Sequence, residues 1–457
     1  MIKNTAELIN NGLDDVTRRL REDACSILEA SLEAVDPEKA IFNALKPEGD
    51  ILRFEGGKVD LSGVNRVLVV GGGKAGGLMA RVVENLLGEY VDSGFVNVLN
   101  GTENAVNLNK IKLHGANHPV PSNSGVEGVK QMLLLTEGLS KDDLVITLIS
   151  GGGSALMPYP TEGIGLDDLQ AITGNLLKAG ATINELNAVR KHLSAFKGGQ
   201  LASHCAPARV VSLILSDVIG DPLDIIASGP TAPDTSNFRD AFNVLERYNL
   251  WDDAPENIKK RITQGVEGKI PDTPKEDDPI FTKVHNILTA NNVIACNAAE
   301  FKAKKLGYDS MILSTYIEGE ARNVGAILTG IAKEIDKRDQ PLRKPAALVI
   351  GGETTVTVKG NGVGGRNMEV ALGASFKITN IDCVVSALGS DGIDGPTTSA
   401  GAIVDRYTLR RSNEKGLDPE KYLGENDSYH FFENIGDCIL TGPTGTNVND
   451  ISLILVR

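Results

Sequence analysis

Glycine-rich loops that carry one basic or hydroxyl residue recur along this chain. Lys74 lies within one run of glycines, Ser150 opens a second run at 150–154, and Arg366 ends a third. Glycine lets a backbone approach a ligand closely and expose its N–H groups to an anion. Several such loops, with a lysine and an arginine among them, predict a polyanionic ligand held from more than one side, with phosphate as the first candidate.

Each basic residue also has a purely structural interpretation. Lys74 would start a helix, where its charge opposes the helix dipole and would only be solvated. Arg366 could pair with a neighbouring carboxylate, and Arg190 lies on a predicted helix where it faces either a ligand or water. The other residues that we expect to line the site are Gly72, Gly73, Ser150, Gly151, Gly152, Gly153, Ser154, Glu353, Thr354 and Asn367.

Two acidic loops resemble one another, and each follows a predicted strand. Asp217 and Asp221 lie in the first, and Asp391 and Asp394 in the second. Paired carboxylates suit a magnesium ion that bridges phosphate oxygens, or a base that accepts an alcohol proton. Aspartates also cap turns and helices, so both interpretations stay open.

Common nucleotide and hydrolase motifs fit this chain poorly. The first loop matches G-x-G-x-x-G at Gly71, Gly73 and Gly76, but the next strand ends at Asn100 and not at the acidic residue that binds a ribose. No Gly-Lys pair is followed by Ser or Thr, which excludes a P-loop. Ser154 lacks the second glycine of G-x-S-x-G, so a serine nucleophile is not indicated.

Composition narrows the class of protein further. The chain has 457 residues, which favours two domains or more, and a net charge of −14, which argues against nucleic-acid or membrane partners. The five cysteines lack metal-ligand spacing and are typical of buried thiols in a reducing compartment. Without a signal sequence or a long apolar run, we expect a soluble, cytoplasmic protein.

The elements that position these loops alternate between strand and helix. Strands are expected at 66–70, 94–99, 110–115, 143–149 and 209–216, with helices at 75–89, 123–138, 166–179 and 184–203. A second series has strands near 286–290, 309–313, 346–351, 355–359, 382–388, 401–404, 437–441 and 451–456, and helices near 292–306, 318–337 and 366–376. Such alternation predicts a sheet covered by helices, with ligands at the carboxyl ends of its strands.

We therefore predict two α/β domains. The first, over 1–263, is a Rossmann-like three-layer α/β/α domain, and the second, over 283–457, is a smaller α/β domain with a mixed sheet. Residues 264–282, rich in Pro, Gly and charge, are expected to link them. The active site would lie in the cleft between the domains.

Motifs spread over nearly the whole chain resemble those of the glycerate 2-kinases, a family also named as hydroxypyruvate reductases. The segments that carry the resemblance, in order, are 69–75, 150–156, 187–194, 216–222, 227–231, 351–354, 364–367, 390–396 and 441–450. The family's active-site lysine and arginine match Lys74 and Arg366, which the resemblance places at an inter-domain cleft.

The resemblance implies an ATP- and Mg²⁺-dependent transfer of the γ-phosphoryl group to the 2-hydroxyl of D-glycerate, giving 2-phosphoglycerate and ADP. D-glycerate and ATP would then be the partners, and a homodimer is compatible with the sequence but not indicated by it. An NAD(P)H-dependent hydroxypyruvate reductase is the alternative, although it needs a ribose-binding acid and a proton donor that the sequence does not reveal. A nucleotide-binding sensor without activity is the third class.

Overall fold

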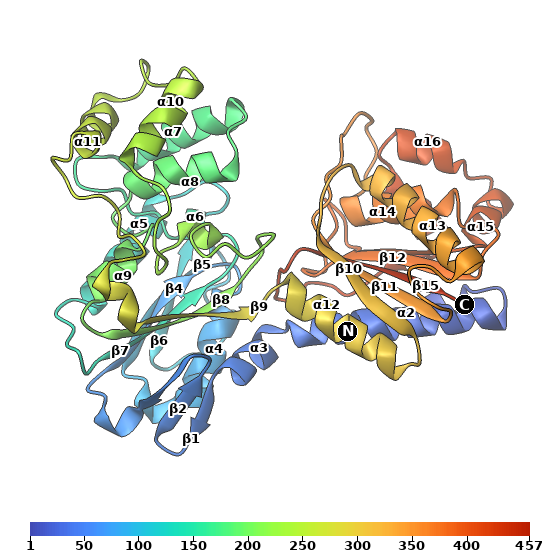
Figure 1. Cartoon of the computed structure of the whole chain (residues 1–457), viewed down its shortest axis with the longest axis horizontal. Coiled ribbons are helices and arrows are strands. Elements are labelled where there is room, and N and C mark those ends of the chain that lie inside the picture. The colour runs from blue at the N-terminus through green and yellow to red at the C-terminus, as the bar shows by residue number, and fades with distance from the viewer. The chain divides into compact units, whose positions relative to one another are not determined.

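The computed structural model describes every residue from Met1 to Arg457 and divides the chain into two compact units (Figure 1). We call Ala40–Thr289 the central unit, and Met1–Lys39 together with Ala290–Arg457 the terminal unit. None of the helices is long and apolar enough to cross a membrane.

The beginning of the chain belongs to the terminal unit, whereas the sequence analysis assigned it to the first domain. Helix α2 (Asp15–Ala34) packs against α12 (Asn292–Lys305) and strands of the terminal sheet. Arg21 on α2 is fully buried and donates to Asp405 at 2.5 Å and to Asp437 at 2.8 Å. The boundary therefore follows buried contacts between segments that are distant in sequence.

The expected linker, 264–282, lies inside the central unit. Thr273 donates through Oγ1 to the buried Asp234 at 2.8 Å, and Asp272 hydrogen-bonds to His192 at 2.8 Å. Hydrogen bonds of polar side chains fix this segment within the central unit. A segment fixed in this way needs no apolar periodicity, so the lack of periodicity was not evidence for a linker.

Six strands form the main sheet of the central unit, in the order β6-β5-β4-β7-β8-β9. The neighbouring pairs from β6 through β8 all run parallel. Val, Leu and Ile dominate β4 and β7, which are buried along their whole length, as parallel strands with both faces covered require. The strands are β4 (Val67–Gly72), β5 (Ser93–Leu99), β6 (Ile111–Ala116), β7 (Leu144–Ile149), β8 (Arg209–Leu215) and β9 (Val284–Ala290).

Helices cover both faces of this sheet. The connection from β4 to β5 and the connection from β6 to β7 cross the sheet in opposite directions, so right-handed crossovers place α4 (Gly76–Leu87) and α5 (Asn123–Leu135) on opposite faces (Figure 1). The same rule puts α9 (Gln200–Cys205) on the face of α5, where Phe196, Leu201 and Met132 share one apolar cluster. From β4 the chain adds β5 and β6 on one side of the sheet, and from β7 it adds strands on the other side. Open α/β sheets bind ligands at such a reversal of strand order, here between β4 and β7.

Smaller substructures complete the central unit. One apolar cluster joins a group of helices beyond the strand ends, namely α7 (Leu166–Lys178), α8 (Ile183–His192), α10 (Phe238–Arg247) and α11 (Glu256–Val266). A short helix, α6 (Gly153–Leu156), follows β7. A three-stranded antiparallel sheet is formed by β1 (Lys46–Glu48), β2 (Ile51–Phe54) and β3 (Gly57–Asp60).

The terminal unit contains a mixed six-stranded sheet in the order β10-β11-β15-β12-β13-β14. Only β10 and β11 pair in parallel, and the other pairs are antiparallel. The strands are β10 (Asp309–Ile317), β11 (Ala346–Gly352), β12 (Cys383–Gly389), β13 (Gly401–Asp405), β14 (Cys438–Ile439) and β15 (Asp450–Val456).

Helices lie on both sides of the mixed sheet, with α2 and α12 on one side and α13 (Ala321–Arg338) and α14 (Arg366–Ser375) on the other (Figure 1). The main apolar core of this unit joins α13, α14 and α17 (Ser428–Ile435) to the sheet. The remaining helices of the chain are α1 (Thr5–Asn10), α3 (Pro37–Ala44), α15 (Thr408–Glu414) and α16 (Pro419–Gly424).

The predicted fold class, α/β with one parallel and one mixed sheet, is confirmed. Two element predictions were wrong. Residues 355–359 form no strand, since Thr355 makes only an isolated bridge to Glu320. The helix expected over 184–203 is broken between α8 and α9, because Gly198 and Gly199 take positive φ angles of 57° and 80°.

Candidate functional site

In the central unit, two glycine loops meet at the neighbouring strands β4 and β7, where the strand order reverses. The loop after β4 carries Lys74, and the loop after the neighbouring β7 carries Ser150 and Gly151. The backbone N–H of Lys74 donates to the carbonyl of Gly151 at 2.9 Å, and the N–H of Ala75 donates to Ser150 Oγ at 3.1 Å. The two loops therefore form one hydrogen-bonded surface at the carboxyl ends of the strands.

Glycine is required in these loops by the close approach of their neighbours. Gly73 has a φ of +147°, and a Cβ there would lie 2.1 Å from Ser150 Oγ. A Cβ on Gly151 would lie 2.2 Å from an oxygen of Asp217, which places the Asp217 carboxylate against the loop. Of the first acidic pair, Asp217 thus joins the loops, whereas Asp221 takes a φ of +55° in the turn that follows.

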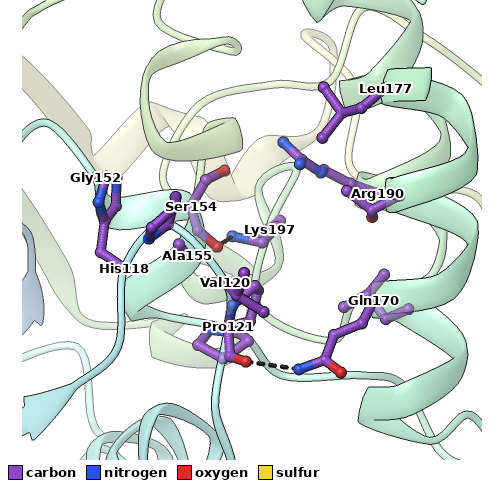
Figure 2. Close-up of a pocket in the computed structure, with 15 residues that line it drawn as sticks. His118, Val120, Pro121, Gly152, Ser154, Ala155, Gln170, Leu177, Arg190 and Lys197 are labelled. Atoms are coloured by element: carbon purple, nitrogen blue, oxygen red, sulfur yellow. Dashed lines mark hydrogen bonds between the residues drawn. The ribbon is translucent and has the colours of Figure 1, made fainter. Parts of the chain in front are cut away.

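A cavity of about 270 Å³ lies beside these loops (Figure 2). Gly152 and Ser154 line it from the loop after β7, His118 and Pro119 from the loop after β6, and Arg190 from α8. A Cβ on Gly152 would lie 3.1 Å from His118 and 3.3 Å from Lys74 Cγ, so the Lys74 side chain runs along the Gly152 side of the cavity. The Lys74 ammonium is exposed and has no partner in the structure.

Two cations line the cavity without a carboxylate among the lining residues. Lys197 is only 2% exposed, and its Nζ donates to the carbonyl of Ser154 at 2.8 Å (Figure 2). Burial, together with the charge of Arg190, lowers the pKa of Lys197 to about 7. Burial also lowers the pKa of Arg190, whose guanidinium has no hydrogen-bond or ion-pair partner. An anionic ligand would stabilise the charged forms of both side chains and so offset the free-energy cost of burying them.

His118 is the titratable group on the other side of this cavity. Burial and the charge of Lys74 lower the pKa of its imidazole. His118 directly precedes a proline in a loop, a position that favours a structural role, yet its ring lies beside the candidate lysine.

The remaining polar side chains of α8 turn to structural partners. Asn187 accepts from Ser228 Oγ at 2.9 Å, and Ser228 in turn hydrogen-bonds to Ser154. Lys191 is buried and pairs with Asp224 at 2.9 Å and with Asp234 at 3.1 Å. Arg190 is therefore the residue of this stretch that faces the cavity.

In the terminal unit, Arg366 begins α14 and is held by two carboxylates. Its Nε and Nη2 donate to the two oxygens of Asp450 at 2.7 and 3.0 Å, and its Nη1 donates to Glu353 at 2.6 Å. Burial works against the charge, but Asp450 and Glu353 keep the pKa of Arg366 above its usual value. The pairing of Arg366 with a neighbouring carboxylate, which the sequence left open, is thus present. It fixes the direction in which the guanidinium group points.

Asp394 and Asn367 form the buried floor of this arrangement. Asp394 accepts the backbone N–H groups of Asn367 at 3.1 Å and Met368 at 2.8 Å, and so caps α14. Asn367 Nδ2 donates to Asp450 at 3.0 Å. Burial raises the pKa of Asp394 to about 7, and burial raises that of Asp450 to about 6 although Arg366 lowers it.

A cavity of about 810 Å³ opens over these residues. Glu353, Arg366 and Asp394 line it together with Asp391, whose Oδ1 accepts the backbone N–H of Ile393 at 3.1 Å and so caps a turn. Thr354 also lines it, and its buried Oγ1 lacks a hydrogen-bond partner. An unsatisfied buried hydroxyl is costly, which makes Thr354 a candidate ligand contact.

The acidic residues do not form a metal site by themselves. No group of three or more His, Cys, Asp or Glu side chains in the chain has the geometry to hold a metal ion. A magnesium ion that keeps its waters and binds through one or two carboxylates and substrate phosphates needs no such group. Asp217, at the glycine loops, has the donor chemistry for that arrangement.

The structure gathers most of the predicted residues into two sets and adds three that were not predicted, His118, Lys197 and Asp450. Lys197 precedes Gly198 and Gly199, and Lys74 also lies next to glycines. The same pattern could therefore have indicated Lys197 as a candidate. Asp450 is the last residue of the 441–450 motif, but nothing in the sequence indicated its partner, because 83 residues separate it from Asn367. The set in the central unit is Lys74, 150–154, Arg190 and Asp217, and the set in the terminal unit is Arg366, Asn367, Glu353, Thr354, Asp391 and Asp394.

Comparisons with known proteins identify the family. A model described as a domain of unknown function, DUF4147, matches residues 23–263, and the MOFRL family model matches 346–450. A protein of Pyrococcus horikoshii named glycerate 2-kinase is 42% identical and covers 96% of this chain and 97% of its own. The crystal structure of a glycerate kinase from Thermotoga maritima has a TM-score of 0.86 at 40% identity, covering 96% of this chain and all of that one.

A protein of Agrobacterium vitis, provisionally named a hydroxypyruvate reductase, is 39% identical over 94% of this chain and 93% of its own. The firm names at the highest identities all state a kinase. The family predicted from the motifs is confirmed, and the chain belongs to the glycerate 2-kinase family.

Proposed function

We propose that this protein transfers the γ-phosphoryl group of MgATP to the 2-hydroxyl of D-glycerate, giving 2-phosphoglycerate and ADP. The observation that carries the proposal is the set of cations without carboxylate partners at the carboxyl ends of the central sheet: Lys74, Arg190 and Lys197. Phosphoryl transfer depends on positioning and charge neutralisation, and these side chains supply both in a family of glycerate kinases.

The central unit contributes a surface for phosphate oxygens. The loops after β4 and β7 would bring glycine backbone close to a ligand, and Lys74 adds an exposed positive charge beside Gly152. Asp217 would hold Mg²⁺ on the phosphates, and the ion would neutralise charge on the transferring group. Asp221 and Asp391 remain alternative carboxylates for the same role.

The terminal unit contributes an oriented arginine and carboxylates with raised pKa values. Asp450 and Glu353 point the Arg366 fork in a fixed direction, which suits a carboxylate or a phosphoryl group. Asp450, with a pKa of about 6, and Asp394, with a pKa of about 7, could accept the proton of the 2-hydroxyl near neutral pH. Glu353, Thr354 and Asn367 would complete the contacts.

A two-arm assay tests this function. Incubation with D-glycerate and MgATP should produce ADP and 2-phosphoglycerate, which phosphorus NMR distinguishes from 3-phosphoglycerate. Incubation with hydroxypyruvate and NADH should leave the NADH absorbance unchanged, because β5 ends at Leu99 and Asn100 follows in place of a ribose-binding acid. Loss of NADH without ADP formation would establish the reductase instead. If neither reaction occurs, the nucleotide-binding sensor without activity is the remaining alternative.

Variants of the basic residues test the mechanism. Lys74→Ala and Arg366→Ala should each lower turnover on the order of 10³-fold, since each removes a charge aimed at the transferring group. Normal turnover in both variants would remove these residues from the site.

Variants of the acidic loops locate the metal. Asp217→Asn should raise the Mg²⁺ concentration needed for half-maximal rate. Asp391→Asn keeps an oxygen that can accept the N–H of Ile393, so it tests the alternative carboxylate without loss of the turn cap. An unchanged magnesium profile in Asp217→Asn would place the metal elsewhere.

The compartment stays a prediction. The five cysteines are free and buried, which supports a reducing compartment, and we propose the cytoplasm.

A further inference from the structure

Both charged and apolar side chains line the cavity of the central unit (Figure 2). Lys197 and Arg190 are its cations, and we refer to them together as the charged side; Ser154 lies next to Lys197. We refer to the apolar lining residues together as the apolar side, and they are Val120, Pro119, Pro121, Ala155, Pro158, Leu169 and Leu177. This combination suits a ligand with an anionic end and a flat or apolar body.

The charged side has unused hydrogen-bond donors. The Lys197 ammonium gives one of its three N–H groups to the carbonyl of Ser154, and the Arg190 guanidinium has no acceptor. No aspartate or glutamate lines the cavity to compensate them. Two adjacent cations with so many free donors match several oxygens of a phosphate group better than one neutral acceptor.

The apolar side argues against D-glycerate as the occupant. Every carbon of glycerate carries oxygen, so each face of the molecule needs polar partners when buried. Among the apolar residues, Gln170 gives one N–H of its amide to the carbonyl of Pro121 at 2.7 Å, and Thr173 is the other polar side chain. A nucleobase, with two apolar faces, is a better match for this side.

We propose that this cavity is the nucleotide site of the kinase, with Arg190 and Lys197 binding phosphate oxygens of ADP or ATP and the apolar side receiving the nucleoside. The proposal rests on the proposed function, which it deepens. The phosphate chain would extend past Gly152 toward Lys74, whose Cγ lies 3.3 Å from the position of a Cβ on Gly152.

Gly174 allows a steric test that leaves the charges in place. It lies within α7 and lines the cavity, and a Cβ at this position meets no atom within 4 Å. Gly174→Leu should fill part of the apolar side without strain. Gly330 on α13 is a matched control, because it is also a helical glycine with no atom within 4 Å of its Cβ position, and it belongs to the terminal unit.

Isothermal titration of the full-length chain with MgADP measures the site without turnover. Arg190→Gln, Lys197→Met and Gly174→Leu should each raise the Kd for MgADP about tenfold or more, which corresponds to about 1.4 kcal/mol per tenfold change. Gly330→Leu and the exposed Lys178→Met should stay within about twofold of the wild type. Thermal unfolding of each variant, followed by Trp251 fluorescence, shows that the central unit is folded.

Titration with D-glycerate distinguishes the two sources of an oxyanion. Its Kd should change less than about twofold in the three cavity variants. If Arg190→Gln and Lys197→Met weaken D-glycerate but not MgADP, or if Gly174→Leu leaves the Kd for MgADP unchanged, the nucleotide assignment is overturned. A chain that binds MgADP as predicted but does not phosphorylate D-glycerate would refute the proposed function and keep this site.

Discussion

Replacement of Lys197 by methionine should stabilise the central unit, and the gain should shrink as the pH rises. Lys197 is 2% exposed, and burial with the nearby Arg190 lowers its pKa from 10.5 to about 7. Between these two pH values the unfolded chain binds more protons than the folded chain. The stability of the wild type therefore rises with pH over this window, and the full cost of burying the charge is present below pH 7.

The size of the effect follows from the two pKa values. Proton linkage gives a cost of about 4 kcal/mol at pH 7 and about 2 kcal/mol at pH 9 for the buried ammonium. Methionine removes this cost but also removes the hydrogen bond to the Ser154 carbonyl, which is worth roughly 1 kcal/mol. Lys197→Met should therefore be more stable than the wild type by about 3 kcal/mol at pH 7 and about 1 kcal/mol at pH 9.

Urea unfolding at both pH values measures this difference. Trp251 is the single tryptophan of the chain and packs on Phe242 within the central unit, so its fluorescence reports the unfolding of that unit. The exposed Lys178→Met controls for the loss of a lysine and should change stability by less than about 0.5 kcal/mol. A Lys197→Met variant that is less stable at pH 7, or whose gain is equal at pH 7 and pH 9, would refute the reasoning.

Three further predictions concern other parts of the chain. Arg366→Lys should lower kcat about 10²-fold or more because an ammonium cannot fork onto Asp450 and Glu353; unchanged steady-state kinetics would contradict this. Gly174→Ala should stabilise the central unit by about 0.5–1 kcal/mol, since the position is helical and has room for a methyl group; urea unfolding that shows no gain would count against it. Burial raises the pKa of Cys25, Cys205 and Cys296 to about 12, so native thiols should react with Ellman's reagent at pH 8 only after unfolding; fast labelling of the folded chain would disprove their burial.

The central sheet could be predicted well from the sequence because its strands are continuous apolar runs. The expected strands at 66–70 and 143–149 correspond to β4 and β7, and glycines directly follow both. Parallel strands with both faces covered leave this strong signal, and their carboxyl ends locate the loops. The location of Lys74 and Ser150 at the carboxyl ends of strands could therefore be predicted, whereas their direct contact depends on the pairing of β4 with β7.

Contacts between distant segments could not be predicted in the same way. Helix α2 has an apolar face, but its pattern does not say which sheet it covers, and it packs on α12 more than 250 residues later. Asp450 is a similar case, because only the antiparallel pairing of β15 with β11 and β12 brings it to Arg366 and Asn367. The burial that lowers the pKa of Lys197 likewise depends on the complete fold.

The burial of Arg21 from α2 against Asp405 and Asp437 has a consequence for synthesis on the ribosome. The chain emerges at roughly 5–20 residues per second, so α2 waits on the order of 10–50 seconds while the 250 residues of the central unit are made. The central unit can collapse during this interval, whereas the apolar face of α2 has no sheet to cover. Nascent α2 is thus a natural binding segment for chaperones, and a fragment that begins at residue 40 would expose the surface of α12 and of the sheet that α2 covers.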